Sequence, residues 1–174
     1  MIETLLRDLR RPEYIHVLLN PLPIYGLAVS LMGLLIAVFA RSRTAQVATL
    51  AIVFLSALSA WPVAEFGEQA YDPVLSMSDE AGQAWLKAHL ARADRFIWFF
   101  YALAALSLAA MLAPLKWPRS SGALAVSVLV LGAAVLGMGG YIGHAGGKVR
   151  HREFRNGPPP KEIRDMEGAA PSAP

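Results

Sequence analysis

Four long stretches of this sequence contain no Asp, Glu, Lys or Arg, and each is long enough to cross a lipid bilayer as a helix. A spanning helix needs about 20 predominantly apolar residues. The composition agrees, since only 17% of the residues are charged, whereas soluble domains carry about a quarter. We therefore predict an all-α membrane protein, a four-transmembrane-helix bundle in the lipid bilayer, with spans at residues 14–40, 44–64, 96–115 and 120–147.

The segments between and around these spans are shorter and more polar. Residues 1–13 alternate acids and arginines and are expected to form an interfacial N-terminal segment. Apolar residues recur at helical spacing over 78–95, which predicts an amphipathic helix that continues into the third span. Residues 14–155 then form the four-helix transmembrane domain. The tail, 156–174, is rich in Pro and polar residues and is predicted to be disordered.

Prolines mark two further features of the chain. Pro21 and Pro23 cannot donate backbone hydrogen bonds, so the first span is expected to bend or begin there. The second span is expected to end at Trp61-Pro62, because an interfacial aromatic residue is followed there by a helix breaker. A polar loop over 65–73 should follow it.

Several classes of function lack the residues they need. The chain has no cysteine, which excludes disulfides, thiolate metal sites and covalent c-type haem attachment. Its serines lack a plausible His–Asp partner, and its glycines follow no strand, so neither serine hydrolysis nor nucleotide binding is indicated. No basic stripe with interleaved aromatic residues points to nucleic acid. We predict no catalytic residue, and an enzymatic activity is not favoured.

Four spans place both termini on the same side of the membrane. Twelve of the 16 Lys and Arg residues lie on that side, which favours cytoplasmic termini by the positive-inside rule. The two tight turns on the other side, 41–43 and 116–119, contain basic residues at higher density and no acids, which argues the opposite. The expectation is cytoplasmic termini.

Three histidines are the candidate ligands of a cofactor. His16 begins the first span, His89 precedes the third and His144 ends the fourth, so all three lie near the same membrane face. Ionisable residues at a membrane are costly and are candidates for function by default. Imidazoles at one level can ligate haem iron in pairs, or bind a transition metal such as copper, iron or zinc. We therefore predict an accessory membrane subunit that binds haem b or a metal.

A structural role for each histidine remains open. His16 could bind carbonyls freed by Pro21 or Pro23, with Asn20 on the same helix face, and His89 could lie in water beside Arg92 and Asp94. His151 follows a basic run and is expected to be solvated. Two carboxylates near the same face, Glu65 and Glu68, could form a proton relay, or could simply pair with Arg92 or Arg95.

Glycines recur every four residues along one face of the fourth span, at Gly139, Gly143 and Gly147. Small residues on one face allow close helix packing, and Gly139, Gly140 and Gly143 would also leave room for a porphyrin. The competing hypothesis is therefore a non-catalytic structural or assembly protein. In that case the glycine face packs on a membrane-protein partner or on a second copy of the chain.

Three short motifs resemble those of a known group of proteins. They are HVLLNPLPI from His16, WPVAEFGE from Trp61 and GGYIGHAGG from Gly139. The chain resembles a group of uncharacterised bacterial four-helix membrane proteins, the predicted membrane family called domain of unknown function 2231. The resemblance implies a multi-pass protein of the bacterial inner (plasma) membrane. The family pattern would place a second histidine after Asn20, where this chain has Pro21, so one ligand of such a site is absent.

Overall fold

The computed structural model describes residues 2–157, and every regular element within that range is a helix. Four helical segments are long and apolar enough to cross a membrane, namely Pro12–Phe39, Arg43–Gln69, Glu80–Lys116 and Pro118–Arg150. The prediction of an all-α, four-helix multi-pass membrane protein is thereby confirmed. Of the predicted disordered tail, all but Asn156 and Gly157 lies outside the described residues.

The first span is interrupted where its prolines predicted. After the short helix α1 (Ile2–Asp8), α2 (Pro12–Leu19) leads into a π-helical turn, η1 (Leu22–Gly26), and then into α3 (Leu27–Phe39). Single π-helical turns within α-helices are frequent at functional sites. This turn divides the span into two α-helical parts, α2 and α3.

The second span also has two parts, and it is longer than predicted. α4 (Arg43–Leu58) is capped by Ser59, and α5 (Ala60–Gln69) and α6 (Tyr71–Ser76) follow. The predicted polar loop over 65–73 is wrong, because most of it is helical. Pro62 lies in the first turn of α5, where a missing N–H has no intrahelical acceptor to lose. The proline therefore starts a new helix.

The third and fourth spans are long helices. α7 (Glu80–Lys116) is one helix, as predicted, and α8 (Ser121–Arg150) returns antiparallel to it after a 3₁₀ turn, η2 (Pro118–Ser120). The 37 residues of α7 extend about 55 Å, whereas the hydrocarbon core is about 30 Å thick. Since residues 96–115 alone match that thickness, the N-terminal half of α7 extends beyond the hydrocarbon.

The core lies between α3, α4, α7 and α8 at the end of the bundle with the tight turns. Close helix contact there depends on glycine, since a Cβ on Gly132 of α8 would lie 2.5 Å from Leu31 of α3. Arg43 of α4 connects this end of the bundle to α7 and α8 through hydrogen bonds. Its guanidinium donates to the carbonyls of Ala110 and Met111 and to Ser121 Oγ. Pro114 has no N–H to offer the carbonyl of Ala110, so Arg43 supplies the missing donor.

An ionic clasp joins the opposite ends of α7 and α8. The Asp79 side chain caps α7 by accepting from the N–H of Gly82, and it also accepts two bonds of 2.9 Å from Arg155. Arg155 donates further bonds of 2.7 Å to the carbonyls of Lys148 and Val149 in the last turn of α8. Arg155 directly follows a 3₁₀ turn, η3 (Arg152–Phe154). It therefore binds the last carbonyls of α8 and the side chain that caps the start of α7.

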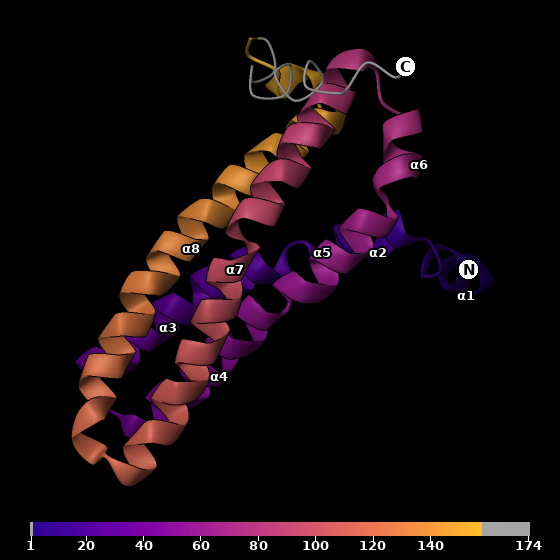
Figure 1. Cartoon of the computed structure of the whole chain (residues 1–174). Coiled ribbons are helices and arrows are strands. Elements are labelled where there is room, and N and C mark those ends of the chain that lie inside the picture. Colours follow the sequence, from indigo (N-terminus) through magenta and orange to yellow (C-terminus); the bar gives the residue numbers. More distant parts are fainter. Residues whose placement is uncertain (1, 158–174) are drawn as a thin grey trace, which may run out of the picture.

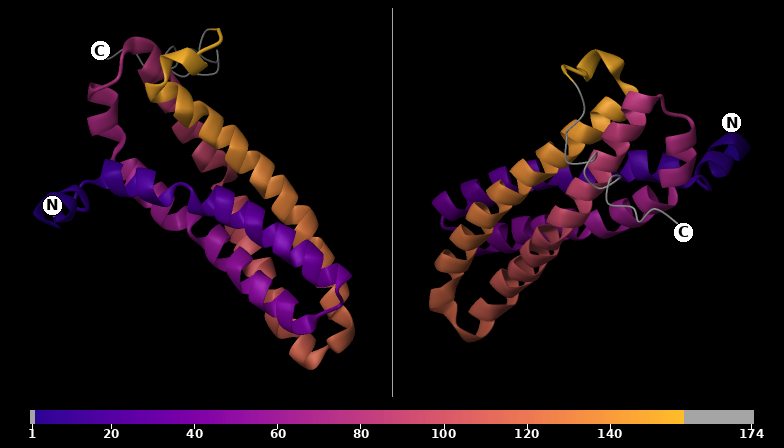
Figure 2. Two further views of the ribbon diagram at one scale, coloured as in Figure 1. Left: turned by 180° about the vertical axis from the view of Figure 1, so that it is seen from behind. Right: turned by 45° about the horizontal axis from the view of Figure 1, so that its top comes forward.

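The two helical hairpins separate toward the clasp end. α2 packs on α5, and α7 packs on α8 along its length. Figures 1 and 2 show the α2–α5 pair diverging from the α7–α8 pair toward the end where α1 lies. The helix breaks at η1 and Ser59 separate α2 from α3 and α5 from α4. The space described below lies between the diverging pairs.

Candidate functional site

A cavity of about 790 Å³ lies between the diverging helix pairs. This volume falls within the range of about 300–1,000 Å³ that is usual for ligand pockets. Its walls come mainly from α2, η1, α5, α6, α7 and α8 and are mostly apolar. Many lining residues are small: Ala60, Ala64, Gly67, Ala70, Ala93, Gly139, Gly143, Gly146 and Gly147. Walls of this kind leave room for a broad, flat ligand between the helix pairs.

His16 enters this cavity from α2 and is held by α5. Its Nδ1 lies 2.8 Å from the backbone carbonyl oxygen of Val63. The ring lies against Gly67, one helical turn further along, where a Cβ would come within 2.9 Å of Nδ1 and Cε1. The expected contact with carbonyls freed by Pro21 or Pro23 is not formed. The partner carbonyl belongs to the neighbouring helix.

His89 enters the same cavity from α7 and is held by α8 in the same way. Its Nδ1 lies 3.0 Å from the carbonyl oxygen of Ile142, and a Cβ on Gly146 would come within 3.1 Å of Nδ1 and Cε1. Again the glycine is four residues after the accepting carbonyl. His89 is half-buried, whereas the sequence allowed a position in water beside Arg92. Arg92 instead donates to the carbonyl of Tyr141 and lies 3.8 Å from the centre of its ring.

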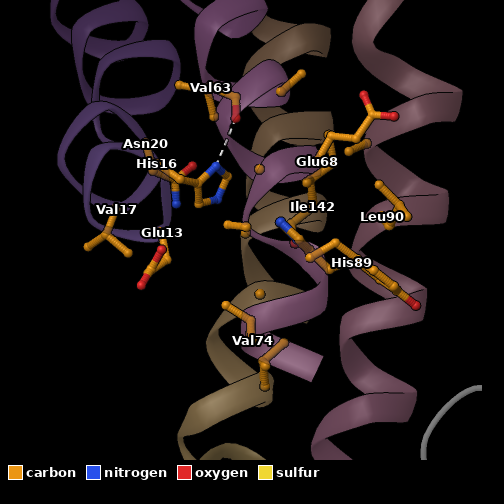
Figure 3. A pocket seen from close by; sticks show the side chains of 18 of the residues that line it. Glu13, His16, Val17, Asn20, Val63, Glu68, Val74, His89, Leu90 and Ile142 are labelled. Carbon is orange, nitrogen blue, oxygen red and sulfur yellow. Dashed lines mark hydrogen bonds between the residues drawn. The ribbon is translucent and has the colours of Figure 1, made fainter. Parts of the chain in front are cut away.

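The two imidazoles face one another across the cavity. Their ring centroids are 6.3 Å apart and their planes are nearly perpendicular, at 82°. Figure 3 shows the two rings pointing toward each other, with His16 turned back to Val63 through its hydrogen bond. The rings form no hydrogen bond with each other, and no residue between 2 and 157 is hydrogen-bonded to either Nε2.

The carbonyl partners determine which nitrogen carries the proton. A carbonyl oxygen only accepts, so each Nδ1 must be the donor, and a neutral imidazole then presents an unprotonated Nε2. Metal-ligating histidines characteristically donate their other ring N–H to a carbonyl or carboxylate, as each Nδ1 does here. The arrangement suits two ligands of one metal ion.

The structure brings together two of the three candidate histidines. His144 is exposed and lines a separate hollow on the outer side of α8 with Glu153 and Phe154. His151 is exposed as well, is 2.9 Å from Glu153 and stacks on Phe154. Within the described range, no group of three or more His, Cys, Asp or Glu side chains is placed to hold a metal ion.

The glycine face of α8 lies against other segments of the same chain. A Cβ on Gly139 would lie 3.3 Å from Phe100, and one on Gly143 would lie 3.5 Å from Ile24, while Gly147 approaches Phe154 at 3.8 Å. All three line the cavity, whereas Gly140 is exposed with no atom near it. At Gly139 and Gly143 this face thus contacts η1 and α7 of the same chain, and packing on a partner or on a second copy stays a prediction.

The two carboxylates of the predicted loop lie on α5 instead. Glu65 accepts a hydrogen bond of 2.8 Å from Gln69, and Glu68 is exposed at the edge of the cavity. Arg92, one of the predicted partners, makes its contacts with Tyr141. The carboxylates therefore form no shared site with one another.

Four residues of the site were not predicted: Val63, Gly67, Ile142 and Gly146. Their distance along the sequence from the two hairpin turns could have indicated them. His16 and Gly67 are equally distant from the turn at Arg41–Ser42, and His89 and Gly146 are equally distant from the turn at Trp117–Pro118. Residues equidistant from the turn of an antiparallel hairpin lie at the same level. Each hairpin thus contributes one histidine and one glycine that meet.

The chain was compared with protein-family models, curated proteins and solved structures. No protein-family model, no curated protein and no solved structure matches the chain. The resemblance to the predicted membrane family called domain of unknown function 2231 therefore stays a prediction.

Proposed function

We propose that this multi-pass membrane protein binds haem b, with His16 and His89 as the two axial ligands of the iron. The observation that supports it is the separation of the rings. If each ring turned its Nε2 to a shared metal ion about 2.0 Å away, the ring centres would lie about 6 Å apart, since each nitrogen lies about 1 Å from the centre of its ring. The observed separation is 6.3 Å.

The number of ligands favours haem over a bare metal ion. Zinc in proteins takes three or four protein ligands, and copper sites likewise combine several. This cavity offers two imidazoles, and the described residues provide no third ligand beside them. A porphyrin supplies the other four positions of an octahedral iron. Because the chain has no cysteine, the haem would be held without covalent attachment, as haem b is.

The shape of the cavity supports the same choice. A porphyrin held by His16 and His89 would have α2 and α5 on one side and α7 and α8 on the other, because each histidine is fixed within one of these helix pairs. Gly139 and Gly143 line the wall beside that plane, where side chains would otherwise project. Part of the space at these two glycines is taken by Ile24 and Phe100, whose side chains approach their Cβ positions.

The proposal describes an accessory, cofactor-binding subunit and assigns no catalytic residue. We also propose, on the resemblance alone, that it belongs to the bacterial inner membrane. The positive-inside rule supports cytoplasmic termini, which would place the cavity at the cytoplasmic face.

The proposal is tested by purifying the protein in mild detergent from haem-replete cells and recording its visible spectrum, haem content and metal content. We expect a Soret band and one haem b per chain. His16→Ala and His89→Ala should reduce haem content at least tenfold. His144→Ala and His151→Ala are matched controls, because both histidines are exposed outside the cavity, and they should keep it. A haem-free wild-type preparation, or haem loss confined to His144→Ala, would overturn the proposal.

A further inference from the structure

We infer that one face of the α7–α8 hairpin binds the phosphate of an anionic membrane phospholipid, with Arg92 and Lys148 as its cations. This cationic face consists of Trp85 and Arg92 on α7 and of Tyr141 and Lys148 on α8. None of the four residues lines the cavity between the helix pairs. The inference therefore stands independently of the proposed haem.

Helical spacing gathers these side chains on one side of the hairpin. On each helix the two members of the face are seven residues apart, which is nearly two full turns. The Arg92 guanidinium lies 3.8 Å from the centre of the Tyr141 ring and 6.0 Å from the centre of the Trp85 ring. The Lys148 ammonium lies 4.3 Å from the centre of the same Trp85 ring. Two cations from two helices thus share one indole.

The chain does not neutralise the positive charge on this face. Within residues 2–157, neither Arg92 nor Lys148 forms an ion pair with a carboxylate. Lys148 is nevertheless only 7% exposed, whereas lysines are almost never fully buried unless they are paired. Over the same range, Trp85 Nε1 is the one enclosed side-chain polar atom that lacks a hydrogen-bond partner. The face therefore lacks an anion.

The two cations still have donors to offer. Arg92 uses one N–H for the carbonyl of Tyr141, and its guanidinium carries four more. The Lys148 ammonium donates to no residue between 2 and 157, and it is not fully enclosed, unlike Trp85 Nε1. A phosphate group, with several acceptor oxygens and a negative charge, would satisfy both side chains.

The depth of the face matches the headgroup region of the bilayer. Arg92 precedes Phe96, where the charge-free segment of α7 begins, by about 6 Å along the helix axis. Lys148 directly follows the charge-free segment of α8. Both cations therefore lie at the edge of the hydrocarbon. Basic pockets between membrane helices bind anionic headgroups at this depth, and an exposed tyrosine such as Tyr141 is typical of the interface.

The neighbouring apolar surface favours a lipid over a free phosphate ion. One further step of seven residues toward the bilayer reaches Phe99 on α7 and Ala134 on α8, and both are exposed. These two residues continue the cationic face into the charge-free part of the hairpin. An acyl chain of the bound lipid would lie against them, whereas an inorganic phosphate ion would leave them uncovered.

Native mass spectrometry of the whole chain, delipidated in mild detergent, tests the inference with added phosphatidylglycerol or phosphatidylcholine. We expect preferential binding of one phosphatidylglycerol per chain. Arg92→Gln and Lys148→Gln should each weaken this binding about fivefold, since a basic residue near an anionic surface contributes about 1 kcal/mol. Arg150→Gln is the matched control, because it removes the same charge from an exposed position two residues from Lys148, and it should keep the preference.

Arg92→Lys separates charge from packing. It keeps the positive charge, so it should retain the preference for phosphatidylglycerol. A loss as large as in Arg92→Gln, an equal loss in Arg150→Gln, or a wild-type protein that binds both lipids equally would overturn the inference. Displacement of phosphatidylglycerol by excess inorganic phosphate would overturn the assignment of the site to a lipid. None of these outcomes depends on the haem content of the protein.

Discussion

The imidazole of His16 lies directly on the backbone of Gly67, so close that a Cβ on that glycine would come within 2.9 Å of Nδ1 and Cε1. The glycine and the carbonyl of Val63 together form the seat of the ring on α5. We therefore expect Gly67→Ala to displace His16 and to lower haem affinity about 10- to 100-fold, as outer-shell substitutions at metal sites do. Haem content and the Soret band of the purified variant measure this.

Stability and haem binding should respond differently in this variant. Alanine is favoured over glycine in a helix by about 1 kcal/mol, which partly offsets the strain of the displaced ring. Gly146→Ala should have the same effect in smaller degree, because its Cβ would meet His89 at 3.1 Å. Gly137→Ala on the same helix is the matched control, since no atom lies within 4 Å of its Cβ position. Equal haem content in Gly67→Ala and Gly137→Ala would contradict the assignment.

The clasp between Asp79 and Arg155 should make the clasp end of the bundle sensitive to acid. The bonds from Arg155, together with that from the Gly82 N–H, lower the pKa of Asp79 to about 2 from its usual 3.8. A lowered pKa in the folded state contributes stability above the unfolded pKa and loses it as the pH falls toward the folded one. We expect amide exchange at 148–155 to accelerate, relative to the intrinsic rate, between about pH 4 and pH 2.

Asp79→Asn tests the cause of that acid sensitivity. The amide cannot ionise, so exchange at 148–155 should already be fast at neutral pH and should lose its pH dependence in the acid range. Glu80→Gln is a useful comparison, since Glu80 is the neighbouring acid at the start of α7. If the Asp79→Asn protein retained the wild-type acid transition, the clasp would not be its source.

Arg43 should stabilise the end of the bundle with the tight turns. It donates to the carbonyls of Ala110 and Met111 and to Ser121, and Pro114 leaves the first of these without its usual helical donor. Arg43→Met removes these bonds, and we expect it to lower the free energy of unfolding by about 1–3 kcal/mol. Thermal unfolding in detergent, followed by circular dichroism, measures the change.

Arg41→Met is the control for the loss of a positive charge in that turn. Arg41 is exposed and adopts a positive φ of 52°, and both side chains would keep the strain of that conformation. The substitution should leave the unfolding temperature nearly unchanged. An equal loss in the two variants would show that charge in the turn, rather than the bonds of Arg43, is what matters.

Orientation decides which compartment the cavity faces. Twelve of the 16 basic residues lie on the side of the termini, so a fluorescent protein fused to the C-terminus should fluoresce and alkaline phosphatase fused there should be inactive. A phosphatase fusion in the turn at 41–43 should be active. The reverse pattern would place the cavity at the outer face and would show that the acid-free basic turns set the topology.

The sequence by itself determined the number of spans, the continuous α7 and the bend at Pro21 and Pro23. Charge-free length and proline chemistry are local properties that need no partner. It failed at 65–73, because a proline marks either the end of one helix or the first turn of the next, and the packing of α5 on α2 selects the second outcome here. It indicated His16 and His89 as candidates because ionisable groups at a membrane are costly wherever they occur.

Only the tertiary structure decided which histidines meet. His144 has the same level and chemistry as the other two, but its position on α8 turns it outward, while Gly146, two residues later, faces His89. A shift of two residues changes helical direction by more than half a turn, and only the packing of α8 on α7 fixes which face is inside. The divergence of the hairpins and the carbonyls of Val63 and Ile142 likewise become a site only when two segments far apart in sequence lie side by side.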